Sequence, residues 1–442
     1  MRVITLIAAI GLLIAVPGVS GQSDGEEGKS LTAEAQLEII DSVTSQLNYR
    51  YVFPEVAKRM EDRLRDLYQK HAYEGIRSTK EFVQALTRNL REVYHDWHLL
   101  VLYYPDSLFE TEIDQEPDEE ELARRRTLNK HRNFSFRRVE RLPGNVGYLK
   151  FDQFVDAKEA APTAIAALNF LGNCDALIID LRDNGGGEPS MIKLLMSYFF
   201  DEETHFNSLV VRYKGETNQL RTQAYVPGPR LSKADIYVLL SYDTFSAAED
   251  MAYNLKHAGR ATLVGARTPG GAHGCEFHNI RSLNIQVKIP CERAVSPFTD
   301  SNWQDVGVEP DIEVPSYKAF DVAYLEAVKK LREKATDEDA IARLDWILPV
   351  LEANLRPVIV GEETLKGYVG EYGPVTTTHD HGSLFAQLPK RRPMKLLAMS
   401  ETMFRCEWHD EWRLEFHPNE KGIAGSVTAF MADGRVFNQN RR

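Results

Sequence analysis

Between Arg137 and Val314, short apolar runs alternate with amphipathic stretches, and this alternation limits the possible folds more than any other feature of the chain. The runs have the length and residue types of strands, and the stretches between them have the apolar spacing of helices. The alternation indicates an α/β core. The expected strands are 146–151, 176–181, 236–240, 262–264 and 283–289, and the expected helices are 158–171, 190–200 and 247–257.

Segments of different character flank this core. Three helical patterns (32–47, 54–71 and 79–94) precede a strand-like run at 99–104, and 110–126 is most simply a solvated surface excursion. Residues 320–355 read as a helix-rich connector, and the short alternating runs after it favour an all-β domain. We therefore expect a signal peptide (1–21), an N-terminal helical domain (31–105), the core (137–335), a helical connector (336–360) and a small β-domain (361–442).

The first residues have the three-part pattern of a secretory signal peptide. A basic start at Arg2 is followed by an apolar run, 3–16, and by small residues at 17–21. The run is shorter than the ~20 residues that a membrane-spanning helix needs. We expect export to the periplasm or the cell exterior, with no membrane anchor after cleavage. Cleavage moves the net charge from −12 to −13, which argues against nucleic acid or an anionic membrane as partner.

The chain contains four cysteines, an even number for an exported protein. Cys275 and Cys291 flank a hairpin-like segment, and we predict a disulfide across its base. Cys174 begins an apolar strand and is expected to be a buried thiol. No pair, Cys406 included, has the Cys-x-x-Cys spacing of a zinc or redox site.

Ser246 stands where an apolar run ends and a helical pattern begins. A serine at such a turn can expose its hydroxyl above the sheet edge, and the free N–H groups of the helix then favour a developing negative charge. The same residues also fit a simple helix cap, in which Glu249 completes a Ser-x-x-Glu capping box. The local sequence leaves both roles open, and the capping role is the commoner of the two.

Two other stretches bear on this serine. The strand at 176–181 leads into Asp180–Gly187, a loop with three consecutive glycines that either presents an N–H to a substrate carbonyl or only makes a tight turn. Its glycines do not have the spacing of a dinucleotide-binding fingerprint. His98 ends the helical region just before a strand, where a histidine serves as a general base or is simply satisfied at a helix end.

In chain order, five stretches resemble the tail-specific (C-terminal processing) serine peptidase family, over roughly residues 31–330. The resemblance implies a crotonase-like (ClpP/crotonase) α/β core with Ser246 as nucleophile. It also implies an oxyanion hole formed by the N–H of Ala247 and an N–H of the glycine loop, which we place at Gly186. The stretches are His98, 180–187, 244–249, 259–265 and 307–311.

Two departures narrow the resemblance. The processing peptidases use a lysine base in a Gly-Lys-Gly stretch, whereas 268–274 contains no lysine, and no PDZ-like segment precedes the core. Both features are similar to the branch of tricorn protease and interphotoreceptor retinoid-binding protein, in which a histidine is the base and a glutamate orients it. His98 fits the base, but Gln304 stands at the glutamate position, with Asp305 beside it as an alternative. An amide in place of such a carboxylate slowed a serine protease about 10⁴-fold.

We therefore expect an exported serine peptidase that cleaves peptides or unfolded proteins through an acyl-enzyme, without a cofactor or metal. The alternative is a weak or inactive family member that binds a hydrophobic ligand or a peptide, and the reactivity of Ser246 separates the two. A zinc site made from 379–381 and 409–410 is the least favoured interpretation. The oligomeric state is left open.

Overall fold

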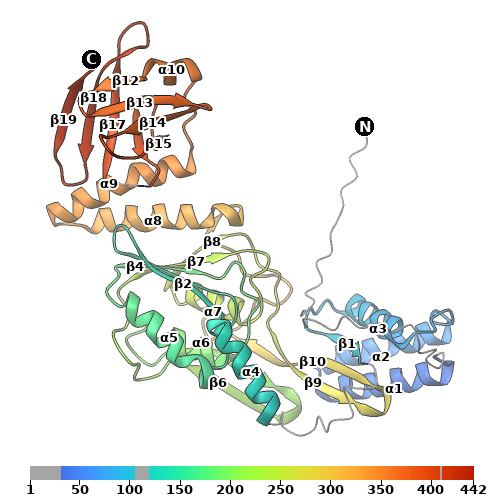
Figure 1. Ribbon diagram of the computed structural model, residues 1–442. Coiled ribbons are helices and arrows are strands. Elements are labelled where there is room, and N and C mark those ends of the chain that lie inside the picture. Colours follow the sequence, from blue (N-terminus) through green and yellow to red (C-terminus); the bar gives the residue numbers. More distant parts are fainter. Residues whose placement is uncertain (1–30, 105–118, 409–410) are drawn as a thin grey trace.

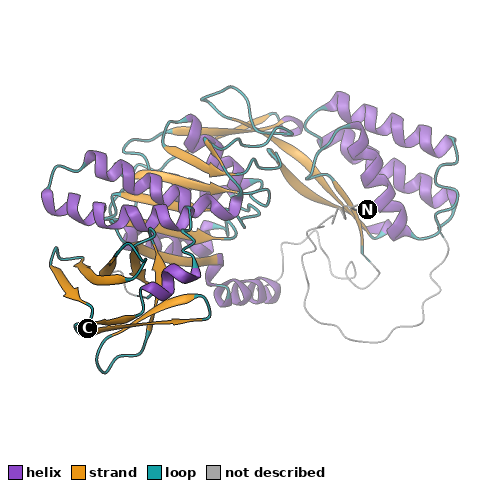
Figure 2. Cartoon of the chain, turned by 90° about the horizontal axis from the view of Figure 1, so that it is seen from above, coloured by secondary structure: helices purple, strands orange, loops and turns teal. Residues whose placement is uncertain are grey.

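The computed structural model describes residues 31–104, 119–408 and 411–442, so the predicted signal peptide lies outside the described residues. In Figure 1 the α/β layers lie between the N-terminal helices and the C-terminal strands, and Figure 2 shows the N-terminal helices at one end of the molecule. None of the helices that the structure describes is long and apolar enough to cross a membrane.

The three predicted N-terminal helices are confirmed as α1 (Ala33–Arg50), α2 (Pro54–Gln69) and α3 (Thr79–Val93). The side chains of Thr32 and Ser78 cap α1 and α3, and Pro54 opens α2, as the sequence signals suggest. The helices share one apolar core with β1 (Leu100–Tyr103) and with Ile285 and Val287 of β10. In Figure 1 the blue helices accordingly lie beside the yellow β9–β10 hairpin.

The central sheet has six strands in the order β11-β8-β7-β4-β3-β2, parallel except for the pairing of β2 with β3. Its inner strands are mostly apolar because both faces of the sheet are covered. Ile179 and Val238 face the core shared with α5, α6 and α7, whereas Ile178 and Tyr237 face the core shared with α8 and α9. The bounds are β2 (Phe136–Leu142), β3 (Val146–Phe151), α5 (Ala157–Leu171), β4 (Ala176–Asp180), α6 (Pro189–Met196), β7 (Asp235–Leu240), α7 (Ala247–His257), β8 (Ala261–Gly265) and β11 (Ile312–Glu313).

A second sheet joins this core to the N-terminal helices. Its order is β1-β10-β5-β6, and β9 also pairs with β10. The sequence patterns predicted only part of it, because β5 and β6 carry many polar residues and lack a clean alternation. The bounds are α4 (Glu119–His131), β5 (His205–Val211), β6 (Glu216–Arg221), β9 (His273–Ile280) and β10 (Ile285–Val295), with short 3₁₀ turns at Asn133–Ser135, Arg212–Lys214, Arg281–Leu283 and Ser316–Lys318.

The predicted connector consists of two helices, α8 (Ala319–Lys334) and α9 (Glu338–Leu355), which lie between the core and the C-terminal part in Figure 1. After α10 (Glu362–Gly367) comes an antiparallel eight-stranded sheet with its own apolar core, so the all-β expectation is confirmed. Its strands are β12 (Gly370–Tyr372), β13 (Val375–Asp380), β14 (Ser383–Gln387), β15 (Met394–Ala398), β16 (Met403–Cys406), β17 (Trp412–Pro418), β18 (Ala424–Met431) and β19 (Val436–Asn440).

Candidate active site

Ser246 occupies a strained turn between β7 and α7. Its backbone has φ +55° and ψ −116°, a conformation that residues other than glycine rarely adopt. An ordinary N-cap residue has β-region angles, as Thr32 and Ser78 do. A strained serine at a strand-to-helix turn is typical of a nucleophile elbow, and such strain tends to occur at functional sites.

The carboxylate of Glu249 holds this turn. It accepts the backbone N–H groups of Ser246 (2.8 Å), Gly270 (2.8 Å) and Gly271 (2.9 Å) and the hydroxyl of Thr268 (2.5 Å). The side chain is fully buried, and burial raises its pKa even though these four donors act in the opposite direction. Glu249 therefore does more than close a capping box, because it joins the Ser246 turn to the segment after β8.

His98 lies against this segment. Its ring is 4.7 Å from the ring of Phe245, the residue before Ser246. A Cβ built on Gly271 would come within 2.9 Å of His98 Cε1 and 2.4 Å of the Phe245 ring. The imidazole thus fills the space that a side chain at position 271 would need, in the same 268–274 stretch where the processing peptidases are expected to carry their lysine.

The surroundings of His98 keep its ring neutral. The side chain is buried, and Nδ1 has no hydrogen-bond partner among the residues that the structure describes. Burial, assisted by the nearby Lys288 charge, lowers the pKa of His98 to about 3, while Asp96 acts in the opposite direction. A neutral imidazole can accept a proton. Within the described parts of the chain, no hydrogen bond joins this ring to the Ser246 hydroxyl.

The glycine loop packs directly on the nucleophile turn. A Cβ on Gly186 would lie 2.8 Å from Ser246 Cβ and 3.0 Å from the nitrogen of Ala247, so only glycine allows this approach. Among the described residues, the N–H of Ala247 has no hydrogen-bond acceptor. The N–H of Gly186, in contrast, donates to Oδ1 of Asn184 at 2.9 Å. Of the two expected oxyanion donors, one is therefore free and the other is engaged.

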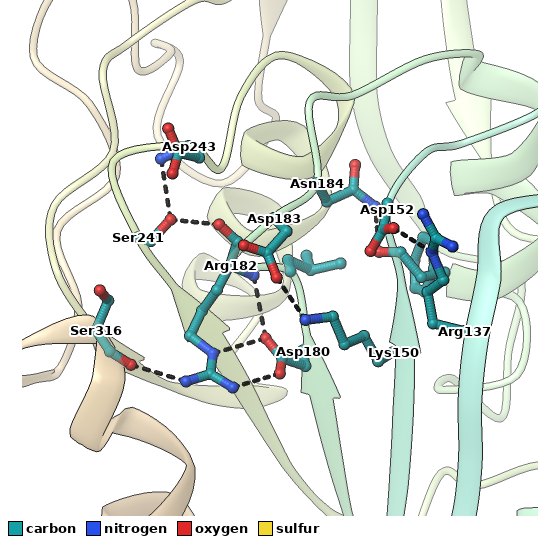
Figure 3. Close-up of polar contacts among 12 residues, drawn as sticks. Arg137, Lys150, Asp152, Asp180, Arg182, Asp183, Asn184, Ser241, Asp243 and Ser316 are labelled. Carbon is teal, nitrogen blue, oxygen red and sulfur yellow. Dashed lines mark hydrogen bonds and ion pairs between the residues drawn. The ribbon is translucent and has the colours of Figure 1, made fainter. Parts of the chain in front are cut away.

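Buried polar contacts fix the base of the glycine loop (Figure 3). The Asp180 carboxylate accepts hydrogen bonds from Nε (2.8 Å) and Nη2 (2.6 Å) of Arg182. The hydroxyl of Tyr148 donates a third hydrogen bond to the same carboxylate, at 2.7 Å. Burial raises the pKa of Asp180, but the Arg182 and Tyr148 hydrogen bonds outweigh burial and the pKa is lowered overall. Arg182 also donates to the carbonyl of Ser316 at 2.9 Å. The Ser241 hydroxyl donates to the Arg182 carbonyl, which connects the loop to the end of β7.

In the described part of the chain, Gln304 makes its hydrogen bonds with residues other than His98. Its side-chain carbonyl accepts the N–H of Ala272 at 2.8 Å, and its Nε2 donates to Asp305 at 3.0 Å. Asp305 itself faces His95, with 3.9 Å between Oδ1 and Nδ1. In the part of the chain that the structure describes, neither residue is hydrogen-bonded to the His98 ring.

A buried aspartate–histidine pair that the sequence patterns did not predict lies beside His98. The Asp96 carboxylate accepts His273 Nδ1 at 2.7 Å, the Tyr51 hydroxyl at 3.2 Å and the backbone N–H of His98 at 3.0 Å. Asp96 and His273 are 0% and 1% exposed, and within the described ranges His273 Nε2 has no hydrogen-bond partner. The available signals were the Asp-x-His spacing at 96–98 and a lone histidine in a glycine-rich segment.

The predicted disulfide is absent, and all four cysteines are free thiols. Cys275 lies opposite Pro290, and the β9–β10 ladder is irregular at Cys291. Burial raises the pKa of both thiols, that of Cys291 to about 12, which disfavours the thiolate needed for disulfide formation. Among the described residues, no three His, Cys, Asp or Glu side chains are grouped closely enough to hold a metal ion. Residues 409–410 of the candidate zinc site lie outside the described residues.

Two family models match the two parts of the chain that contribute residues to this site. Residues 145–314 match the model of peptidase family S41, and residues 31–134 match that of the N-terminal domain of this family in eukaryotic IRBP. A carboxyl-terminal-processing protease of Picosynechococcus sp. is 32% identical over 127 residues, or 28% of this chain and 29% of that protein. The match therefore spans less than a third of the length of this curated relative.

Solved structures are similar at low sequence identity. A photosystem II D1 C-terminal processing protease is 13% identical with a TM-score of 0.44, covering 64% of this chain and 94% of that chain. For tricorn protease the identity is 15% and the TM-score 0.43, covering 68% of this chain and 37% of that chain. The two family matches follow one another along the sequence and include His98, the glycine loop and the Ser246 turn, so this chain belongs to peptidase family S41.

Proposed function

We propose that the chain is an exported serine peptidase that cleaves peptides or unfolded proteins, with Ser246 as nucleophile and His98 as general base. One observation carries the proposal: the strained Ser246 turn lies against a glycine loop and next to a buried, neutral histidine ring. A nucleophile, a base and backbone donors on three separate segments are the parts that acyl transfer requires.

The reaction follows from these positions. His98 takes the hydroxyl proton as Ser246 Oγ attacks the carbonyl carbon of the scissile bond. The N–H of Ala247 and one from the glycine loop stabilise the oxyanion, and the imidazolium then gives its proton to the leaving amine. Water, deprotonated by His98, hydrolyses the acyl-enzyme and regenerates Ser246. For Gly186 to act as the second donor, its N–H must leave the Asn184 carbonyl.

Two finer points belong to the same proposal. The βαβ layers between β3 and β8 form a crotonase-like core, which is supported by the position of the oxyanion donors at the carboxyl end of the parallel strands. The substrate is a polypeptide, in line with the name of the matched relative, a carboxyl-terminal-processing protease. Export is supported by the sequence of residues 1–21, and the negative net charge makes nucleic acid an unfavourable partner.

A second function is favoured by a specific observation. A pKa near 3 makes His98 a weak base, and the amide of Gln304 supplies no charge to its ring. A family member with so weak a base would bind a hydrophobic ligand or a peptide at this site without turning it over. The reactivity of Ser246 distinguishes this function from hydrolysis.

The test is fluorophosphonate labelling of the purified mature protein, together with hydrolysis of a fluorescently labelled unfolded protein. Wild type should label and hydrolyse, whereas Ser246→Ala should do neither and should melt at nearly the same temperature. Ser301→Ala, at an exposed serine, serves as the matched control and should behave as wild type. Hydrolysis that persists in Ser246→Ala would exclude the mechanism, and an unreactive wild type would favour the binding function.

A further inference from the structure

Asp96 is a buried carboxylate beside the expected base. It is 0% exposed, and its three hydrogen-bond donors come from three different places in the fold: Tyr51 after α1, the backbone of His98, and His273 at the start of β9. A carboxylate buried this deeply persists only when it is well paired. Here the pairing spans the N-terminal helices and the core.

The usual source of negative charge for such a histidine is missing. Gln304 stands where this branch of the family is expected to carry a glutamate, and it holds the backbone of Ala272 instead. Without a carboxylate near His98, the imidazolium formed during the reaction would be buried and unbalanced, which is costly. Oδ1 of Asp96 accepts a hydrogen bond from the backbone N–H of His98, with 3.0 Å between the oxygen and the nitrogen. The carboxylate charge is therefore held close to the residue that carries the imidazole ring.

We propose that Asp96 is the positioning residue that supplies this charge, held in place by His273. His273 donates Nδ1–H to Oδ2, which fixes the ionised carboxylate, while Oδ1 accepts the N–H of His98. Asp96 does not contact the substrate. It stabilises the protonated state of His98 through space and holds the backbone from which the ring projects. The inference rests on the proposed role of His98 as base.

The electrostatic environment agrees with this role. Burial raises the pKa of Asp96, but the His273 hydrogen bond and the nearby histidines outweigh burial and the pKa is lowered overall. Two cations face His98, Lys288 on β10 and Arg91 on α3, and both disfavour its protonation; Asp96 is the carboxylate that opposes them. The other titratable groups around this carboxylate are Tyr51, Tyr94, Cys275 and His273.

Asp96→Asn removes the charge and nearly preserves the shape. We expect kcat to fall by up to about 10⁴-fold, the loss seen when the carboxylate partner of a catalytic histidine becomes an amide. KM should change little, because Asp96 is not a substrate contact. Asp96→Glu should recover part of the loss. Tyr51→Phe is the matched control: it removes one donor to the same carboxylate, keeps the charge and should retain most of kcat.

NMR of ¹⁵N-histidine-labelled protein gives a readout that does not depend on hydrolysis. The Nδ1–H of His273 should give a low-field proton signal in wild type that is lost in Asp96→Asn. His98 should titrate near pH 3 in wild type, as its pKa indicates, and should resist protonation further in the variant, because the anion that favours imidazolium is gone. A purely structural Asp96 would lower the melting temperature and leave this titration in place.

The outcomes separate this inference from the proposed function. If wild type neither labels nor hydrolyses, the peptidase proposal fails, while the titration of His98 still decides whether Asp96 acts on it. If wild type is active and Asp96→Asn keeps both kcat and the His98 titration, the inference is overturned. A His98 titration that moves up in pH in Asp96→Asn would also overturn it.

Discussion

The carboxylate of Glu249 accepts the backbone N–H of Ser246 at 2.8 Å, and the same carboxylate binds Gly270 and Gly271. A single side chain on the first turn of α7 thus sets the nucleophile turn and also the glycine segment on which the His98 ring rests. Nucleophile and base come from segments far apart in sequence, and their relative position depends on this one buried group.

Glu249→Gln should lower both stability and activity. The amide replaces one acceptor oxygen by an NH₂ group, so at least one of the four donors faces another donor. Leaving a buried donor unsatisfied costs about 1–3 kcal/mol. We expect a lower melting temperature and slower fluorophosphonate labelling. Glu420→Gln, at an exposed position, should show neither change, and unchanged labelling in Glu249→Gln would remove Glu249 from the positioning of Ser246.

Gly271→Ala should lower turnover by about 10²-fold or more. The new methyl group would lie 2.4 Å from the Phe245 ring and 2.9 Å from His98 Cε1, so at least one of these rings must move. Displacement of a base by about 1 Å can cost 10²-fold in rate. Gly425→Ala, where a Cβ meets no atom within 4 Å, is the matched control for backbone effects. The measurement is kcat of both variants and of the wild type. A fully active Gly271→Ala would show that catalysis does not require the position of the His98 ring seen in the structure.

The sequence predicted those parts of the molecule that local patterns determine. Strands such as β3 and β7 and helices such as α3 and α7 were found because burial imposes a period on the sequence. β5 and β6 were missed because they carry many polar residues and lack a clean alternation, and the other partner of β5 is β10, which is distant in sequence. The same holds in the site: Ser246 stands in a local motif, whereas the contact between Asp96 and His273 joins residues 177 positions apart.

Stability should fall as pH rises toward neutrality, because of Asp250. This carboxyl on α7 is buried between Asn207 (2.8 Å) and Asn254 (2.7 Å), and burial raises its pKa from 3.8 to about 7. The folded state therefore holds its proton over a range where the unfolded chain has lost it. Stability from this group is complete below about pH 4 and is lost progressively up to pH 7, by at most about 1.4 kcal/mol per pH unit.

Urea unfolding at several pH values measures this effect. The asparagine of Asp250→Asn cannot titrate. From pH 4 to 7 the unfolding free energy of the wild type should therefore fall relative to that of the variant. Asp337→Asn, at an exposed helix cap, is the control for the loss of a carboxylate. A difference between wild type and Asp250→Asn that stays constant with pH would show that Asp250 is ionised throughout.

Gln304 and Asp305 provide the last prediction, because each was a candidate for orienting His98. Gln304 instead holds the N–H of Ala272, and Asp305 lies near His95. Gln304→Glu keeps an acceptor for Ala272 but brings a second carboxylate beside Asp305, so we expect a small loss of stability and a turnover close to wild type. Asp305→Asn should also leave turnover nearly unchanged.

The comparison with Asp96→Asn makes this prediction decisive. If Asp96 supplies the charge for His98, the loss of kcat should appear in Asp96→Asn and in neither Gln304→Glu nor Asp305→Asn. A rise in turnover for Gln304→Glu would mean that position 304 reaches His98 once substrate is bound, since a new carboxylate there would stabilise the imidazolium. A loss of orders of magnitude in Asp305→Asn would assign that role to Asp305. Steady-state kinetics on the three variants, measured side by side, distinguishes these outcomes.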